Sequence, residues 1–521
     1  LLLALICVPF LALLPRELRG QEFVCSGFNP PRPSPGATAK IAGPVSLSAS
    51  DRVHALVVFA RFQEENSGPP PSYAEHIFDP GHQGSLSHFY GTMSSGTLHL
   101  TGTVLPQRYV SDQRSADYVR TVGIGQYGRF VAEILRQVDR DVDLAIFDNE
   151  GPDGVPNSGD DDGYVDHVFI NLMSAPRGFL RGGATGIANL GAELYYTDDA
   201  AANGGTIIVS NSVNFGSIQK EGTFAQTVGS MAHEFGHRLG LPDLYDVSYG
   251  TPAEDSAGIG RWGLMGWGAH GWNWTDGPNP FSAWSLEQLG WIGRENDRLV
   301  ELGTDATGVA LASLRSGGSI YKIPLRATDG GTYWVIEDYL LLERRSRDSY
   351  YDRNIPGQGA LIWHVRSEVT DNGDENAKVV DLVCADGLFA DSGYPAGRAV
   401  DPLYGGDNLD FWSHDQEYAE THYGNWGDAT DLFDGLRYTE LNLGTNPSTN
   451  PAGLIPRAST GLQVGIRQTD GDFIIDIRQP RWSGLIDEEV RWAGEVIVDG
   501  DLEISPRGTL HIHKDTVVRL S

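Results

Sequence analysis

The sequence predicts an α+β domain, followed by a β-sandwich domain and by the start of a β-repeat. Helical and strand-like apolar patterns are mixed up to about residue 293, whereas strand patterns dominate beyond it. In the segment 481–521 apolar positions recur every eight residues, as in a solenoid or β-roll. The expected divisions are a signal peptide at 1–20, a Pro-rich linker or pro-segment at 21–50, the α+β domain at 51–293, the β-sandwich-like domain at 294–480 and the repeat at 481–521.

Composition narrows the classes of partner. The chain of 521 residues carries 38 Lys and Arg against 69 Asp and Glu, which gives a formal net charge of −31. Such an acidic surface repels phosphate backbones and anionic lipid, so nucleic acid is excluded as an expected partner. Excess carboxylate suits divalent cations instead, because they prefer oxygen ligands.

The beginning of the chain predicts export. The apolar run Leu1–Leu14, closed by Pro15, is too short to span a bilayer but suits the core of a secretory signal. A buried helix is the alternative. The initiator Met and a basic leader are missing, so we expect a chain truncated at its start. No other stretch is apolar enough to cross a membrane, which predicts a secreted or extracellular protein, with attachment to a cell surface left open.

Apolar patterns place four elements early in the α+β domain. We expect a buried strand at Arg52–Phe62, a helix passing into a hairpin strand at Ser85–Thr103, a helix at Tyr118–Asp141 and a second buried strand at Tyr164–Leu172. This mixture of strands and helices is expected to continue to about Gly293.

Strands dominate the rest of the chain. They are expected at SIYKIPL, TYWVIEDYLLLE, GALIWHV and FIIDIRQ, which start at Ser319, Thr332, Gly359 and Phe473. The eight-residue repeat is carried by Leu502, Leu510 and Val518, by Ile504, Ile512 and Leu520, and by Gly500 and Gly508. A hairpin appended to the sandwich is the alternative, and we expect the repeat to continue beyond Ser521.

The strongest chemical signal is His233-Glu234-Phe235-Gly236-His237. Apolar residues before it recur at helical spacing, so both histidines are expected on one helix. Separation by four residues stacks them on the same face, about 6 Å apart, where both imidazoles can reach one zinc ion. Glu234 lies beside the first ligand and can take a proton from a zinc-bound water, whose pKa the metal lowers to about 7.

The residues after this motif predict a third ligand. Gly240 is where the helix is expected to end, because Gly accepts the left-handed conformation that reverses the chain. Pro242 forbids further helix, and Asp243 can then turn back toward the histidines. Downstream, Met265 lies between glycines in RWGLMGWG (261–268), which suits a tight turn beneath the metal.

These motifs resemble known families. The pattern HExxHxxGxxD with a Met loop resembles the metzincin zinc peptidases, although Asp243 replaces the His that is usual there as third ligand. HEFGHRLGLPDLYD (233–246), RWGLMGWG, PFSAWSLEQLGWI (280–292), VHALVVFARF (53–62), LSHFYGTMSSGTLHLTGTV (86–104), VIEDYLLLERR (335–345) and GQGALIWHV (357–365) are similar to the immune inhibitor A family of secreted bacterial metallopeptidases. The resemblance implies a metzincin-like zincin fold in the α+β domain.

The same resemblance implies a function. It suggests a zinc endopeptidase acting on extracellular proteins, with His233, His237 and Asp243 as ligands and Glu234 as catalytic acid and base. Glu234 would deprotonate the attacking water and return the proton to the leaving amine. The alternatives are a catalytically inactive surface adhesion or scaffold protein with a zincin-like domain, and a narrow exopeptidase.

An acidic stretch, DNEGPDGVPNSGDDDGYVD at 148–166, predicts a second metal site. Carboxylates at alternating positions beside a Gly turn resemble the start of a calcium loop, so Asp148, Asp160, Asp162 and Asp166 are candidate calcium ligands. The glutamate that closes an EF-hand is missing, and a solvated acidic turn is the alternative. The family carries a shorter stretch here, so an insertion after Asn149 weakens Asp148 most.

Several other residues have a possible structural role beside a chemical one. His270 could stabilise the oxyanion and Tyr245 could donate to the transition state, but packing is the more common role of such residues. His364 is expected to be structural. After signal cleavage removes Cys7, Cys25 and Cys384 remain. They could pair, one could be a spare thiol, or Cys25 could cover the metal site of a latent precursor.

Overall fold

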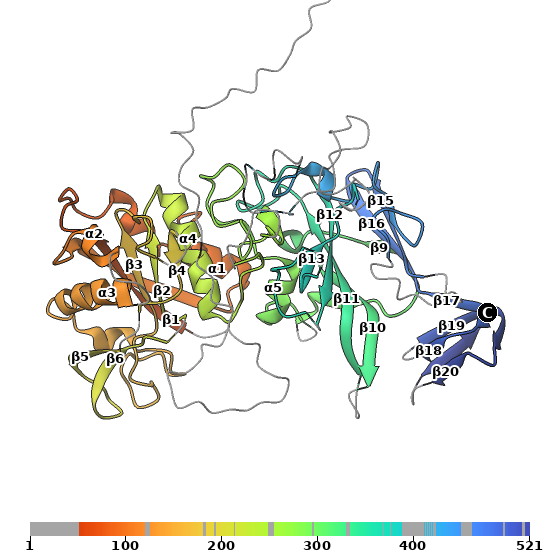
Figure 1. Cartoon of the computed structure of the whole chain (residues 1–521), viewed down its shortest axis with the longest axis horizontal. Helices are drawn as coiled ribbons and strands as arrows, with labels where there is room; N and C mark the ends of the chain where they lie inside the picture. Colours follow the sequence, from red (N-terminus) through yellow and green to blue (C-terminus); the bar gives the residue numbers. More distant parts are fainter. Residues whose placement is uncertain are drawn as a thin grey trace, which may run out of the picture.

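The computed structural model describes Cys25 and residues 52–521, apart from 120–124, 181–183, 192–193, 213, 248–254, 294–295, 330–333, 368, 376, 388–410, 450–460, 493–494, 513–515 and several positions between 412 and 423. Figure 1 shows three parts that follow one another along the chain. Helices and a sheet, in orange to yellow-green, lie on the left, longer strands in green and cyan lie in the centre, and small blue sheets lie on the right. The expected signal peptide at 1–20, and the segment 21–50 apart from Cys25, lie outside the described residues.

The first part is built on a five-stranded sheet with strand order β2-β1-β3-β7-β4. Its strands are β1 (Arg52–Arg61), β2 (His99–Val110), β3 (Val168–Leu172), β7 (Gly216–Lys220) and β4 (Gly186–Ile187). The hairpin expected for the strand after Ser85 is wrong, because β2 pairs with β1 in parallel, Arg52 opposite His99. The intervening helix α1 (Leu86–Met93) and the segment before it supply the crossover that parallel strands need. Only β4 runs antiparallel to its neighbour β7.

Strand β1 is buried on both faces, which explains its continuous apolar sequence. Val57 and Phe59 point into one core and Leu56 and Val58 into the other, as the two-residue period of a strand requires. Helices α1 and α4 (Phe224–Arg238) contribute to the first core, and α3 (Gly125–Val138) to the second. The helix expected at Tyr118–Asp141 is thus α3, preceded by the short α2 (Ser115–Val119). A small hairpin of β5 (Tyr195–Ala200) and β6 (Thr206–Val209) completes this part.

The central part consists of two sheets. One has the order β13-β12-β11-β10-β8, the other β14-β15-β16-β9. The strands are β8 (Leu299–Glu301), β9 (Ala306–Ala310), β10 (Ile320–Asp329), β11 (Trp334–Arg345), β12 (Gly359–Arg366), β13 (Val380–Leu382), β14 (Glu440–Leu441), β15 (Gln463–Thr469) and β16 (Asp472–Arg478). Apolar residues of both sheets, among them Leu340, Ile362 and Ile475, form a shared core between them.

The first and central parts share a core. Leu340 and Leu342 of β11 belong to the core shared by the two central sheets, whereas Tyr339 and Leu341 belong to the first core, where β11 contacts α5 (Ala283–Gln288). Arg345, 5% exposed, donates from one guanidinium nitrogen to the carbonyl oxygens of both Trp262 and Phe281, at 3.2 Å each. The sheets fall on either side of the expected division at 293, but apolar packing continues across it.

The last part contains two small sheets of parallel strands. They comprise β17 (Arg481–Ile486), β18 (Glu489–Trp492), β19 (Glu495–Ile504), β20 (Thr509–Ile512) and β21 (Val517–Leu520). Strand β17 pairs with β19, β19 with β21 and β18 with β20, all in parallel. Because a hairpin requires antiparallel strands, the appended-hairpin alternative does not describe these pairs. None of the described helices combines the length and apolar character that crossing a bilayer requires.

Candidate metal centre

Helix α4 positions the candidate site. Thr223 caps its start, accepting from the backbone N–H of Gln226, whose own side chain accepts from the Thr223 N–H. From Thr227 to Arg238 every residue is buried, so the helix lies inside the core rather than on it. Gly240 has φ +90°, the left-handed conformation expected there, and the chain turns back directly after it.

The two histidines are oriented by backbone carbonyl groups. His233 Nδ1 lies 2.8 Å from the carbonyl oxygen of Leu264, and His237 Nδ1 lies 2.8 Å from that of Leu241. A carbonyl only accepts, so in both rings Nδ1 carries a proton and donates, and Nε2 is the nitrogen that a metal ion can bind once it replaces any proton directed at Asp243. The ring centroids are 5.0 Å apart. The helix and the loop beyond it therefore direct the Nε2 atoms of both imidazoles to one point, as metal-binding histidines require.

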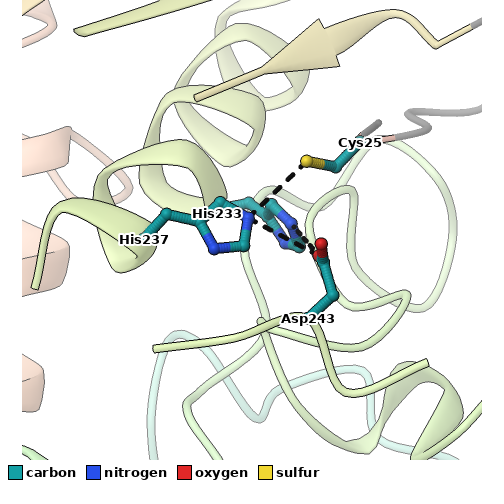
Figure 2. A group of neighbouring side chains, drawn as sticks. All are labelled: Cys25, His233, His237 and Asp243. Carbon is teal, nitrogen blue, oxygen red and sulfur yellow. Dashed lines mark hydrogen bonds and ion pairs between the residues drawn. The ribbon is translucent and has the colours of Figure 1, made fainter. Parts of the chain in front are cut away.

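Asp243 turns back toward this point, as Figure 2 shows. Its Oδ1 lies 3.0 Å from His233 Nε2 and 3.5 Å from His237 Nε2. Burial by itself would raise the pKa of Asp243, but the charge of His237 and the hydrogen bonds from both histidines hold it well below its usual range. Burial likewise opposes charge on His237, yet the Asp243 carboxylate raises its pKa to about 9. The site is therefore built around negative charge on Asp243.

The residues present fit a zinc ion. Ligand atoms bound tetrahedrally to one zinc ion at 2.0–2.1 Å lie about 3.3 Å from one another, close to the two nitrogen–oxygen distances above. Glu234 Oε1 and Asp243 Oδ2, on side chains that are 0% exposed, have no hydrogen-bond partner within the described part of the chain. Orphaned buried carboxylate oxygens are costly unless a cation compensates them. Burial also raises the pKa of Glu234, to about 8.

Met265 lies against the helix between the histidines. A Cβ atom on Gly236 would lie 2.5 Å from Met265 Sδ, so only glycine allows this approach. The carbonyl of Met265 accepts from the backbone N–H of Leu244 at 2.8 Å, which ties the Gly-rich loop to the segment that carries Asp243. The loop that carries Met265 is thus hydrogen-bonded to the segment that carries Asp243.

Two further candidates lie close by. The Tyr245 hydroxyl donates to the carbonyl oxygen of Cys25 at 3.4 Å, and its ring lies 6.5 Å from that of His233. His270 Nε2 lies 3.1 Å from Ser230 Oγ, and burial lowers its pKa to about 4. A small open recess is lined by Tyr245, Gly266, Trp267, Ala269, His270 and Trp274. His364, in contrast, pairs with Asp338 at 2.5 Å within the central sheet, away from the site.

Comparison with known proteins shows which family the chain resembles. Residues 72–293 match the family model of the immune inhibitor A peptidase M6 catalytic domain. This segment is therefore similar to the peptidase M6 family. The chain is also similar to the pre-pro-metalloprotease PrtV of two Vibrio cholerae serotype O1 strains, M66-2 and ATCC 39315 (El Tor Inaba N16961). Each match is 30% identical over 285 residues and covers 48% of this chain but only 29% of the relative.

The acidic stretch at 148–166 forms a second cluster. Asp148, Glu150 and Asp166 bring carboxylate oxygens within 4.8 Å of one another. Asp148 Oδ1 and Glu150 Oε2 have no hydrogen-bond partner among the described residues. Burial, followed by the neighbouring carboxylates, raises the pKa of Asp148 to about 8, and burial raises that of Asp166 to about 9. The backbone N–H of Asp162 donates to Glu150 at 2.9 Å.

Two members of the predicted set, Asp160 and Asp162, lie outside this group of three carboxylates. Asp160 lies at the surface, where it bonds to Ser158, because the neighbouring Asp161 turns inward and accepts from the backbone N–H groups of Gly151 and Ser158. Asp148, the weakest candidate in the sequence, lies instead at the centre. Glu150 was not predicted, although its position two residues after Asp148 was a usable signal.

Proposed function

We propose that the chain is a secreted zinc-dependent endopeptidase that hydrolyses peptide bonds in extracellular proteins. His233, His237 and Asp243 hold the ion, and Glu234 is the catalytic acid and base. One observation carries the proposal: three donor atoms converge beside the buried carboxylate of Glu234, whose Oε1 has no hydrogen-bond partner among the described residues, within a segment that matches the peptidase M6 catalytic domain. Export is supported by the signal-like Leu1–Leu14 and by the printed name of the Vibrio cholerae relatives, which are pre-pro-proteins.

The residues divide the reaction between them. A bound zinc ion supplies Lewis acidity, which polarises the scissile carbonyl and acidifies a water. Glu234 takes the proton of the attacking water and passes it to the nitrogen of the leaving amine. Its raised pKa suits both steps, since a group that titrates near neutral pH can accept and return a proton. The hydrogen bonds from His233 and His237 to backbone carbonyls keep both rings fixed throughout.

The sheet supplies a place for an extended substrate. Strand β4 is the last strand in the order of its sheet, so its outer edge has backbone groups available for pairing. Cys25 forms a parallel bridge to Gly186 of β4 while its side chain lies at the candidate metal site. We propose that a substrate segment pairs with the same edge by strand addition, which brings its scissile bond to Glu234.

Residues 21–50 are proposed to be a pro-segment, so peptidase activity is tested in two forms, the full chain and a form that begins at residue 51. We expect the shorter, zinc-loaded form to hydrolyse casein, a chelator to abolish hydrolysis and added zinc to restore it. Equal rates with and without stoichiometric zinc would contradict the metal requirement. Folded, zinc-loaded protein that cleaves nothing in either form would favour the inactive adhesion or scaffold alternative.

Tyr245 is proposed to stabilise the oxyanion. Its hydroxyl already donates to a carbonyl oxygen beside the site, that of Cys25, and could donate in the same way to the substrate carbonyl. We expect Tyr245→Phe to lower kcat about a hundredfold, with zinc content unchanged, as for loss of one oxyanion donor. Tyr195→Phe is the matched control, because the Tyr195 hydroxyl bonds to Asp139 in the hairpin region. An equal decrease of kcat in both variants, or no decrease in Tyr245→Phe, would contradict oxyanion stabilisation by Tyr245.

We also propose that Asp148, Glu150 and Asp166 bind calcium, with Asp162 alongside. The support is the orphaned oxygens of Asp148 and Glu150, since oxygen donors of this kind are what calcium prefers. The ion would offset the repulsion between these buried carboxylates. It would also join the start of the acidic stretch, at Asp148, to its end at Asp166.

Calcium is expected to stabilise the protein more at pH 8 than at pH 5. Without a cation, folded Asp148 and Asp166 keep protons up to pH values of about 8 and about 9, whereas unfolded aspartates release them near pH 4. The folded chain then binds more protons than the unfolded chain, so its stability falls as the pH rises from about 4 through this range. Calcium replaces the protons and should raise Tm by about 5 °C at pH 8.

Calorimetry at both pH values, with zinc held constant, measures this difference. Asp160→Asn is the matched control, because it removes an exposed carboxylate of the same loop that lies outside the cluster, whereas Asp166→Asn should abolish the calcium effect. A calcium shift that is the same at both pH values, or that survives Asp166→Asn, would count against this site.

A further inference from the structure

Cys25 lies at the candidate zinc site although 212 residues separate it from His237. Its side chain is 1% exposed, and its Sγ lies 3.5 Å from His237 Nε2. The thiol also donates toward Glu234 Oε2 at 3.6 Å. Figure 2 shows the sulfur aimed at the point where His233, His237 and Asp243 converge. Cys25, His233, His237 and Asp243 thus present four donor atoms within 4.8 Å of one another.

The sulfur stands at the distance that a fourth ligand would have. Zinc–sulfur bonds of about 2.3 Å and zinc–nitrogen bonds of about 2.05 Å, at the tetrahedral angle, place the two donor atoms about 3.6 Å apart. The observed separation of Cys25 Sγ and His237 Nε2 is 3.5 Å. Two imidazoles, one carboxylate and one thiolate make a closed set of the kind found in structural rather than catalytic zinc sites.

A cation at this point is indicated independently of the cysteine. Glu234 Oε1 and Asp243 Oδ2 are fully buried and have no hydrogen-bond partner in the part of the chain that the structure describes. These orphaned oxygens belong to the helix and to the loop after it, not to the segment that carries Cys25. The thiol therefore lies in a site where a metal ion would compensate buried oxygens that belong to other segments.

Two backbone contacts hold Cys25 in this place. It pairs in parallel with Gly186 at the edge of β4, and its carbonyl oxygen accepts from the Tyr245 hydroxyl at 3.4 Å. Both are contacts that the proposed function gives to the substrate. A disulfide does not compete for the sulfur, because Cys25 and Cys384 are not bonded to each other in this structure.

We propose that Cys25 is the fourth zinc ligand of a latent form and that the peptidase becomes active when Cys25 leaves the site. This inference rests on the proposed function. On closure the Cys25 thiol gives its proton to Glu234 Oε2, a sulfur–zinc bond forms and the bound water departs. Opening reverses each step. We call Cys25 in this position the latch. It removes the attacking water, protonates the proton acceptor Glu234 and covers the edge of β4 at which the substrate is proposed to pair.

Cobalt substitution of the full chain tests the latch without an activity assay. A thiolate bound to cobalt gives an intense charge-transfer band in the near ultraviolet, whereas nitrogen and oxygen ligands give only the weaker visible bands. We expect the charge-transfer band in the wild type and in Cys384→Ser, and its loss in Cys25→Ser and Cys25→Ala. All four proteins should bind one cobalt ion. If about nine-tenths of the wild-type molecules are in the latent form, only about one-tenth are active. Cys25→Ser should then hydrolyse casein about tenfold faster than the wild type.

The outcomes separate the latch from the function itself. One bound cobalt ion with no charge-transfer band in the wild type, or a band that survives both Cys25 variants, would overturn the latch and leave the metal site standing. Failure of the wild type, Cys25→Ser and Cys25→Ala alike to bind cobalt would overturn the zinc site and the latch together. Equal casein rates in the wild type and Cys25→Ser would show that the thiol does not restrain the enzyme.

Discussion

Replacing Glu234 by glutamine is expected to lower kcat by about a thousandfold while zinc binding is retained, within the range found for loss of general acid–base catalysis. Glutamine has nearly the same shape, so the helix and its histidines should stay in place, but it cannot accept the proton of the attacking water. The structure makes this loss specific, because Glu234 is fully buried beside the donor atoms and its Oε1 serves no structural hydrogen bond among the described residues. The measurement is the steady-state rate on casein of the form that begins at residue 51.

Two controls accompany that variant. Zinc content and Tm of Glu234→Gln should equal or exceed those of the parent, since the substitution removes a buried carboxylate whose ionisation burial opposes. A lower kcat together with lost zinc would point to a structural role. Unchanged kcat with zinc bound would show that another group takes the proton, and Glu234 would then no longer be the acid and base.

Removing the carboxylate of Asp243 is the second large change. Asp243→Ala should weaken zinc binding by about a hundredfold or more, since even the loss of residues that only support a ligand costs 10- to 100-fold. Oδ1 of Asp243 contacts the Nε2 atoms of both His233 and His237. Loss of the side chain therefore also removes this contact from two buried imidazole rings. Competition with a chromophoric chelator, in the form that begins at residue 51, measures the affinity without a contribution from Cys25.

Asp246→Asn is the matched control for this variant. Asp246 is a buried carboxylate three residues further along the same loop, and it lies outside the group of four donor atoms. Its replacement should leave the zinc affinity unchanged. If the two substitutions weaken zinc to the same extent, the loop as a whole rather than Asp243 determines affinity. If Asp243→Ala binds zinc as the parent does, Asp243 is not a ligand.

The local part of the site was predictable because helix geometry fixes it. A spacing of four places His233 and His237 on one face, and Gly240 with Pro242 forces the reversal that brings Asp243 back. The structure shows this arrangement directly. Sequence alone also placed the buried strand β1, because apolar residues on both faces require cover on both sides.

What depends on contacts between distant segments was not predictable to the same degree. The direction of β2 depends on where α1 packs, and the hairpin expected there proved wrong. The choice of Asp148 over Asp160 depends on how the loop turns around Asp161. The sequence left three roles open for Cys25: a disulfide, a spare thiol or a cover of the metal site. Only the fold places its sulfur beside the histidines.

The central claim is that zinc held by His233, His237 and Asp243 and a base at Glu234 together cleave peptide bonds. The most direct test is casein hydrolysis by the form that begins at residue 51, with and without Glu234→Gln, at equal and stoichiometric zinc content. The account predicts hydrolysis by the parent and about a thousandth of that rate in the variant. Equal rates in the two proteins, or no hydrolysis by folded, zinc-loaded parent on casein or on a mixed peptide library, would contradict it.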